Sequence, residues 1–188
     1  MNDSDYMQRC IDLALLGKGM VAPNPMVGCV IVHNKRIISE AFHMHFGSSH
    51  AENSAIELVE DKSLLAESTV YISLEPCAHF GKTPPCVDLL IKYKLKKVVV
   101  GCRDSNPLVA GKGIEKLIKS GIEVIEGVLE DECKELNKRF FTFHEKKRPY
   151  VILKWAQTND GYLDKLREKG EVGSNWISAP ETKALVHK

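Results

Sequence analysis

Two segments organise this chain: His50-Ala51-Glu52 and Pro76-Cys77-Ala78-His79-Phe80-Gly81-Lys82-Thr83-Pro84-Pro85-Cys86. Together they offer one imidazole, from His50, and two thiolates, from Cys77 and Cys86. A catalytic zinc ion takes three protein ligands of these kinds and keeps one position open for water. Glu52 lies two residues after His50, so it can flank such a metal without binding it. A structural zinc site would need a fourth ligand instead, for which His79 is the nearest candidate.

The pattern of apolar residues predicts the elements that carry these two segments. Apolar runs predict strands at residues 27–32, 36–42, 69–74, 97–102 and 122–126, with a hairpin turn at 33–36. Helices are predicted at residues 4–18, 50–59, from 84 onward, 111–120 and 130–144, the first three capped by Ser4, Ser49 and Thr83. Strands that alternate with helices indicate a three-layer α/β/α sandwich around a mixed, mostly parallel sheet.

Both halves of the predicted metal site lie where a helix begins. Cys86 falls in the first turn of the helix that is predicted to start at Pro84, and His50 opens the helix before it. The positive end of a helix dipole favours a thiolate, so we expect a lowered pKa at Cys86. Two helix N-termini are therefore predicted to face one metal ion.

Charge and hydropathy exclude several classes of protein. The 188 residues hold 26 basic and 25 acidic side chains, so the chain lacks the basic excess of a nucleic-acid or membrane-surface binder. No apolar run approaches the ~18 residues that a membrane span needs. The polar, acidic start at residues 1–5 does not resemble a secretory signal. We therefore expect a soluble, cytoplasmic protein whose partner is a small molecule, with homo-oligomerisation left open.

The other cysteines are expected to serve packing rather than chemistry. Six cysteines are present, and without an export signal disulfides are the weaker explanation. Four of them lie in predicted strands or helices and are expected to be small buried apolar side chains: Cys10, Cys29, Cys102 and Cys133.

The two opening segments resemble the riboflavin-biosynthesis pyrimidine deaminases, a branch of the cytidine deaminase-like superfamily. In that superfamily a His-x-Glu segment and a Pro-Cys segment hold the catalytic zinc. Eight residues separate the two cysteines here, whereas cytidine and transfer-RNA adenosine deaminases usually have two. The resemblance covers residues 1–145 and includes Pro23-Asn24-Pro25, Asp104-Ser105-Asn106-Pro107 and Gly111-Lys112-Gly113.

This resemblance implies a zinc-dependent hydrolase. The implied reaction converts 2,5-diamino-6-ribosylamino-4(3H)-pyrimidinone 5′-phosphate and water into the matching uracil derivative and ammonia. His50, Cys77 and Cys86 are the implied zinc ligands, and Glu52 is the implied general base and acid. The implied substrate contacts are Asn24 and His43 for the ring, Lys82 and Asn106 for the ribose phosphate, and His79 and Asp104 as further candidates.

Residues 146–188 resemble the opening of a second domain, an NADPH-dependent reductase. Three residues match positions that contact nucleotide or substrate in that domain: Ala156, Ser174 and Trp176. An apolar run at residues 150–155 predicts a strand, followed by a turn at 158–161. The family's reductase is much longer, so we expect the start of a truncated domain here, without NADPH binding or reductase activity.

Two alternatives stay open on the sequence. The first is a nucleoside or nucleic-acid deaminase of the same fold. The near-neutral charge speaks against the nucleic-acid version, because phosphate backbones are bound by clustered Lys and Arg. The second is a silent interaction domain stabilised by zinc, although such a site has no use for the proton shuttle offered by Glu52. Four other histidines receive no role: His33, His45, His144 and His187.

Overall fold

A computed structural model describes residues 1–79, 84–106, 109–173 and 177–182. The chain divides into two compact units, Met1–Tyr150 and Val151–Lys188. The first unit contains the segments that carry the candidate site, and each unit is described by itself.

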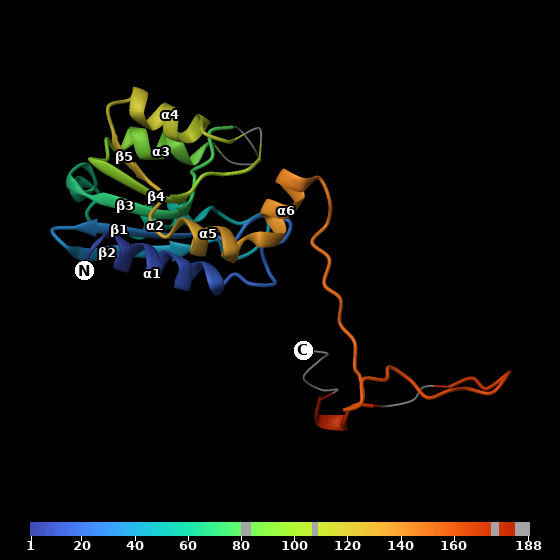
Figure 1. Ribbon diagram of the computed structural model, residues 1–188. Helices are drawn as coiled ribbons and strands as arrows, with labels where there is room; N and C mark the ends of the chain where they lie inside the picture. Colours follow the sequence, from blue (N-terminus) through green and yellow to red (C-terminus); the bar gives the residue numbers. More distant parts are fainter. Residues whose placement is uncertain (80–83, 107–108, 174–176, 183–188) are drawn as a thin grey trace. The chain divides into compact units, whose positions relative to one another are not determined.

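The first unit is built on one five-stranded sheet with strand order β2-β1-β3-β4-β5 (Figure 1). The strands are β1 (Gly28–His33), β2 (Arg36–Phe42), β3 (Thr69–Leu74), β4 (Lys97–Cys102) and β5 (Glu123–Glu126). β1 pairs antiparallel with β2 and β3, whereas β3, β4 and β5 pair in parallel. The sheet is therefore mixed, and β1 alone runs against the other strands.

Helices cover both faces of this sheet and make the predicted three-layer α/β/α sandwich. One layer holds α2 (Ala51–Leu58), α3 (Cys86–Lys92) and α4 (Lys112–Lys119), and the other holds α1 (Asp3–Leu15), α5 (Glu130–Leu136) and α6 (Lys138–Lys146). Neighbouring residues of β4 enter different cores: Val98 and Val100 pack with the first layer and Val99 with the second. Because both faces are covered, the central strands β1, β3 and β4 consist largely of buried apolar residues.

The helix starts differ from the sequence prediction in their capping residues. α1 is capped by Asn2 rather than Ser4, through reciprocal hydrogen bonds between Asn2 and Asp5. The cap of α2 is His50 rather than Ser49, and its imidazole makes no capping bond. α3 begins at Cys86 after the cap residue Pro85, so Cys86 does lie in the first turn, while Thr83 falls outside the described residues.

Two further elements were not expected from the apolar pattern. A 3-10 helix, η1, spans Lys62–Glu67 and connects α2 to β3. The single helix predicted at 130–144 is broken at Asn137, which ends α5 and precedes α6. The side chain of Asn137 bonds to a distant backbone segment, so the reason for the break is tertiary.

The second unit does not contain the strand predicted at residues 150–155. Those residues have no regular secondary structure, and no strand pairs with them among the described residues. A strand is stabilised by its neighbours in a sheet, so this apolar run stays irregular. The predicted turn is present, with the backbone N–H of Gly161 donating to the carbonyl oxygen of Thr158 at 2.9 Å. Across the described part of the chain, no helix is both long and apolar enough to cross a bilayer.

Candidate metal centre

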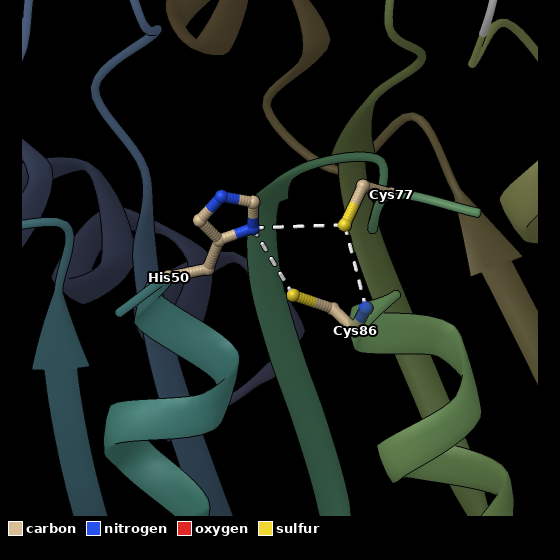
Figure 2. Close-up of side chains that lie close together, drawn as sticks. All are labelled: His50, Cys77 and Cys86. Atoms are coloured by element: carbon tan, nitrogen blue, oxygen red, sulfur yellow. Dashed lines mark hydrogen bonds between the residues drawn. The ribbon is translucent and has the colours of Figure 1, made fainter. Parts of the chain in front are cut away.

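Three potential metal ligands converge from separate elements at the carboxyl end of β3. His50 precedes α2, Cys77 lies in the loop after β3, and Cys86 opens α3. The Nδ1 atom of His50 lies 3.2 Å from Sγ of Cys86 and 3.6 Å from Sγ of Cys77 (Figure 2). The backbone N–H of Cys86 donates to Sγ of Cys77 at 3.3 Å. The structure therefore brings the side chains of the three predicted ligands together.

The geometry of this cluster fits a tetrahedral zinc ion. The three ligand atoms all lie within 4.8 Å of one another. Tetrahedral zinc with its usual bond lengths to sulfur and nitrogen holds such atoms roughly 3.5–3.8 Å apart. One nitrogen and two sulfur atoms are also the soft donors that zinc prefers. His79 is exposed and does not belong to this group, so the described residues do not supply the fourth ligand of a structural site.

The thiols of Cys77 and Cys86 differ in their pKa. The pKa of Cys77 is lowered to about 4, chiefly because the Cys86 thiol donates a hydrogen bond to it, with further help from His50. The pKa of Cys86 is raised by that same bond and by burial. We had expected the thiolate at the helix N-terminus, but without a metal it lies on Cys77. A metal ion requires both thiolates, so its binding releases a proton from this pair.

Glu52 lies beside the cluster in the first turn of α2 and is only 3% exposed. Burial, together with a smaller effect of the nearby Cys77, raises the pKa of its carboxyl group to about 7, and His50 opposes this shift. A cation at the cluster would favour the charged form of Glu52. A carboxyl group in this position can accept a proton and release it again near neutral pH.

A cavity of about 440 Å³ opens over the cluster. Its wall contains His50, Cys77 and Glu52. It also contains five of the six predicted substrate contacts: Asn24, His43, His79, Asp104 and Asn106. The sixth, Lys82, lies outside the described residues, as do Ser174 and Trp176. Ala156 belongs to the second unit and is exposed.

His43 is held in one tautomer between two neighbours. Its Nδ1 atom lies 3.1 Å from the carbonyl oxygen of Ser49, which can only accept, so Nδ1 carries the proton. Its Nε2 atom lies 3.2 Å from Nδ2 of Asn24 and is left as the acceptor. Burial lowers the pKa of His43, which favours this neutral form. The side-chain oxygen of Asn24 is thereby oriented by a fixed partner.

Asp104 has a structural contact as well as a place in the cavity wall. Its Oδ1 atom accepts the backbone N–H of Asn106 at 2.7 Å and so shapes the loop that carries both residues. Burial raises the pKa of Asp104 to about 6, although the bond from Asn106 opposes this shift. The nearby Glu75 contributes to this raised pKa of Asp104, although less than burial does.

Several residues near the cavity were missed in the sequence. Glu75, Phe140 and His144 line the cavity, although His144 had been given no role. The rings of Phe140 and His144 pack with their centroids 4.4 Å apart. Asn137 anchors the segment that follows Asn24. Of these residues, only Glu75 could have been found from the sequence. It directly follows a predicted buried strand and precedes Pro76-Cys77, and a carboxylate is rarely buried without a specific partner.

Comparison with known proteins gives consistent matches. The zinc-binding region of cytidine and deoxycytidylate deaminases matches residues 1–102. The riboflavin biosynthesis protein RibD of Actinobacillus pleuropneumoniae is 47% identical over 188 residues, which cover all of this chain and 48% of that protein. A diaminohydroxyphosphoribosylamino-pyrimidine deaminase of Buchnera aphidicola is 48% identical over 141 residues, or 75% of this chain and 95% of that protein.

A solved structure gives the same result. The crystal structure of a diaminohydroxyphosphoribosylaminopyrimidine deaminase/5-amino-6-(5-phosphoribosylamino)uracil reductase from Thermotoga maritima is 48% identical and superposes with a TM-score of 0.85. The match covers 98% of this chain and 52% of that one. The chain spans about half the length of the RibD proteins it matches.

Proposed function

Because the chain belongs to the cytidine and deoxycytidylate deaminase family, and within it to the diaminohydroxyphosphoribosylamino-pyrimidine deaminases, we propose that it is a zinc-dependent pyrimidine deaminase of riboflavin biosynthesis. The proposed substrate is 2,5-diamino-6-ribosylamino-4(3H)-pyrimidinone 5′-phosphate. Water replaces the 2-amino group, and the products are the 5-amino-6-ribosylamino-uracil 5′-phosphate and ammonia.

The observation that carries this proposal is the buried carboxyl group of Glu52 next to three convergent zinc-type ligands. His50, Cys77 and Cys86 would hold the zinc ion beside the cavity. When bound, zinc lowers the pKa of a water molecule to roughly 7. Glu52 would accept a proton from the attacking water and pass it to the departing amino group. A silent structural domain would have no use for this buried carboxyl group.

The cavity walls supply the groups that orient the substrate. Asn24, fixed by His43, offers an amide to the polar edge of the pyrimidine ring. Asp104, Asn106 and His79 belong to other segments of the wall and are proposed to contact the ribose and its substituents. Lys82 is proposed to bind the 5′-phosphate through a charge-assisted hydrogen bond.

We propose that residues 146–188 are the start of a reductase domain, as the name of the Thermotoga maritima protein suggests for that chain. Ala156, Ser174 and Trp176 would then belong to its nucleotide or substrate pocket. NADPH is proposed as a cofactor only of a complete reductase domain. Cytoplasmic location and homo-oligomerisation remain predictions.

Zinc content and ammonia release, measured on the same sample, test this function. We expect about one zinc ion per chain and ammonia release from the phosphorylated ribosylaminopyrimidine. Cytidine and an adenosine-containing RNA serve as comparison substrates and should be poor. Efficient turnover of either comparison substrate, with none of the proposed one, would assign the chain to another branch of the superfamily.

A further inference from the structure

Glu75 lies directly after β3 and is only 4% exposed. Both oxygens of its carboxylate nevertheless accept hydrogen bonds from backbone N–H groups. The Oε2 atom accepts the backbone N–H of Asp104 at 3.2 Å and that of Gly111 at 2.9 Å. The Oε1 atom accepts the backbone N–H of Gly113 at 3.0 Å and that of Ile114 at 3.4 Å. One side chain therefore holds both ends of the segment between β4 and α4.

The backbone around this carboxylate is shaped to reach it. The first N–H groups of a helix have no partner within the helix, and Glu75 supplies one for the start of α4. Gly111 adopts a left-handed conformation with φ of +77°, which glycine adopts without strain. A Cβ atom on Gly113 would lie 2.2 Å from the carbonyl oxygen of Pro76. Glycine at this position lets α4 approach the residue that precedes Cys77.

The bonded segment carries two of the proposed substrate contacts. Asp104 is itself a donor to Glu75, and Asn106 follows within the turn that Asp104 closes. Each oxygen of Glu75 already accepts two N–H groups, so the carboxylate has no need of a further partner. Its bonds point to the loop, whereas Glu52 is the acidic side chain beside the metal ligands.

We propose that Glu75 is a positioning residue, which fixes the Asp104–Asn106 turn relative to the metal centre and thereby sets substrate affinity. This inference rests on the proposed deaminase function, because it assumes that the turn contacts the substrate. Glu75 joins the turn to the Cys77 loop through one rigid group. Its loss therefore lets the two walls of the cavity move independently.

Glu75→Gln tests the proposal with almost no change in volume. Whichever way the amide is turned, its NH₂ group faces two backbone N–H groups that need an acceptor. We expect the value of kcat/KM to fall by roughly 10- to 100-fold, mainly through KM. The zinc content should stay unchanged, because Glu75 bonds to none of the ligand side chains.

Glu126→Gln is the matched control. Glu126 accepts two bonds from the side chain of Arg103, at 2.6 and 3.1 Å, and Arg103 adjoins the same loop. This pair is exposed and lies outside the cavity wall, so its loss should change neither zinc content nor KM. An increase in KM equal to that of Glu75→Gln would overturn the specific role of Glu75.

Hydrogen exchange separates this inference from the proposed function. In Glu75→Gln, peptides covering residues 104–114 should exchange faster by roughly tenfold or more, while peptides of α2 and α3 exchange as in the wild type. Uniformly faster exchange would show a general loss of stability and overturn the proposal. If the wild-type protein released no ammonia, the proposed function would fail, and the exchange result would still show whether Glu75 fixes the loop.

A double-mutant cycle with Asn106→Ala completes the test. If Glu75 acts through the turn, adding Glu75→Gln to Asn106→Ala should cost much less than it costs alone. If the free-energy losses of the two variants added in full, Glu75 would not act through the turn that carries Asn106. Should Glu75→Gln fail to fold, Glu75→Asp keeps the charge and shortens the reach. It should then show an intermediate KM together with faster exchange at 104–114, and wild-type values for both would contradict the proposal.

Discussion

Asn137 and Met26 are 111 residues apart in the sequence and form a two-bond pair. The side-chain oxygen of Asn137 accepts the backbone N–H of Met26, and its amide donates to the Met26 carbonyl, both at 2.8 Å. This pair fixes the segment after Asn24 and coincides with the break between α5 and α6. The break in turn precedes Phe140 and His144, which line the cavity.

Asn137→Ala should weaken both the fold and the site. It leaves the backbone donor and acceptor of the half-buried Met26 without these partners, which costs roughly 1–3 kcal/mol of unfolding free energy. KM should rise as well, since the segment that carries Asn24 loses the two hydrogen bonds between Met26 and Asn137. Chemical denaturation and substrate titration measure the two effects. The neighbouring exposed variant Lys138→Ala should change the unfolding free energy by no more than about 0.5 kcal/mol, and equal losses in the two variants would contradict this account.

Asp104→Asn should stabilise the metal-free protein at high pH. The pKa of Asp104 in the folded protein is about 6, above its usual value, so ionisation destabilises the folded state. This cost is fully present above pH 6 and disappears as the pH falls below the unfolded pKa of about 3.8. The amide keeps the acceptor for Asn106. We expect the variant to be more stable by about 1–2 kcal/mol at pH 8, with no difference near pH 3.5. A difference in stability that does not change with pH would contradict the raised pKa of Asp104.

The sequence predicted the sheet closely and the connections between distant segments poorly. The strands at 69–74 and 97–102 match β3 and β4, because runs of buried apolar residues determine them locally. The strand at 36–42 matches β2, which follows from the hairpin turn before it. The convergence of His50, Cys77 and Cys86 followed from a motif. Asn137 and Glu75 escaped notice because their partners are backbone groups far away in the chain, which leave no periodic pattern. The strand predicted at 150–155 failed because a strand requires a neighbour as well as apolar residues.

The phosphate contact proposed for Lys82 can be tested by a thermodynamic cycle. A charge-assisted hydrogen bond contributes on the order of 1.5–3 kcal/mol, or roughly 10- to 150-fold in kcat/KM. Removing the phosphate from the substrate and introducing Lys82→Ala should each cost about this much. Both changes together should cost little more than one, because they delete the same interaction. Losses that add in full would mean that Lys82 does not bind the phosphate.

Cys86→Ser should separate metal binding from folding. The substitution removes one of the three ligands that lie within 4.8 Å of one another. Loss of a ligand should reduce the zinc content well below one ion per chain and abolish ammonia release. Circular dichroism should still show the α/β spectrum, since the two cores on either side of the sheet remain. Full zinc occupancy and full activity in Cys86→Ser would disprove the ligand assignment.

The central claim is that Glu52 moves protons beside a metal held by His50, Cys77 and Cys86. Ammonia release from the phosphorylated ribosylaminopyrimidine by zinc-loaded Glu52→Gln, compared with the zinc-loaded wild type, tests it most directly. The account predicts equal zinc content and at least a ~100-fold lower rate in the variant, because glutamine keeps the shape of the side chain but cannot accept and release a proton near neutral pH. A near-normal rate with zinc bound would contradict the account.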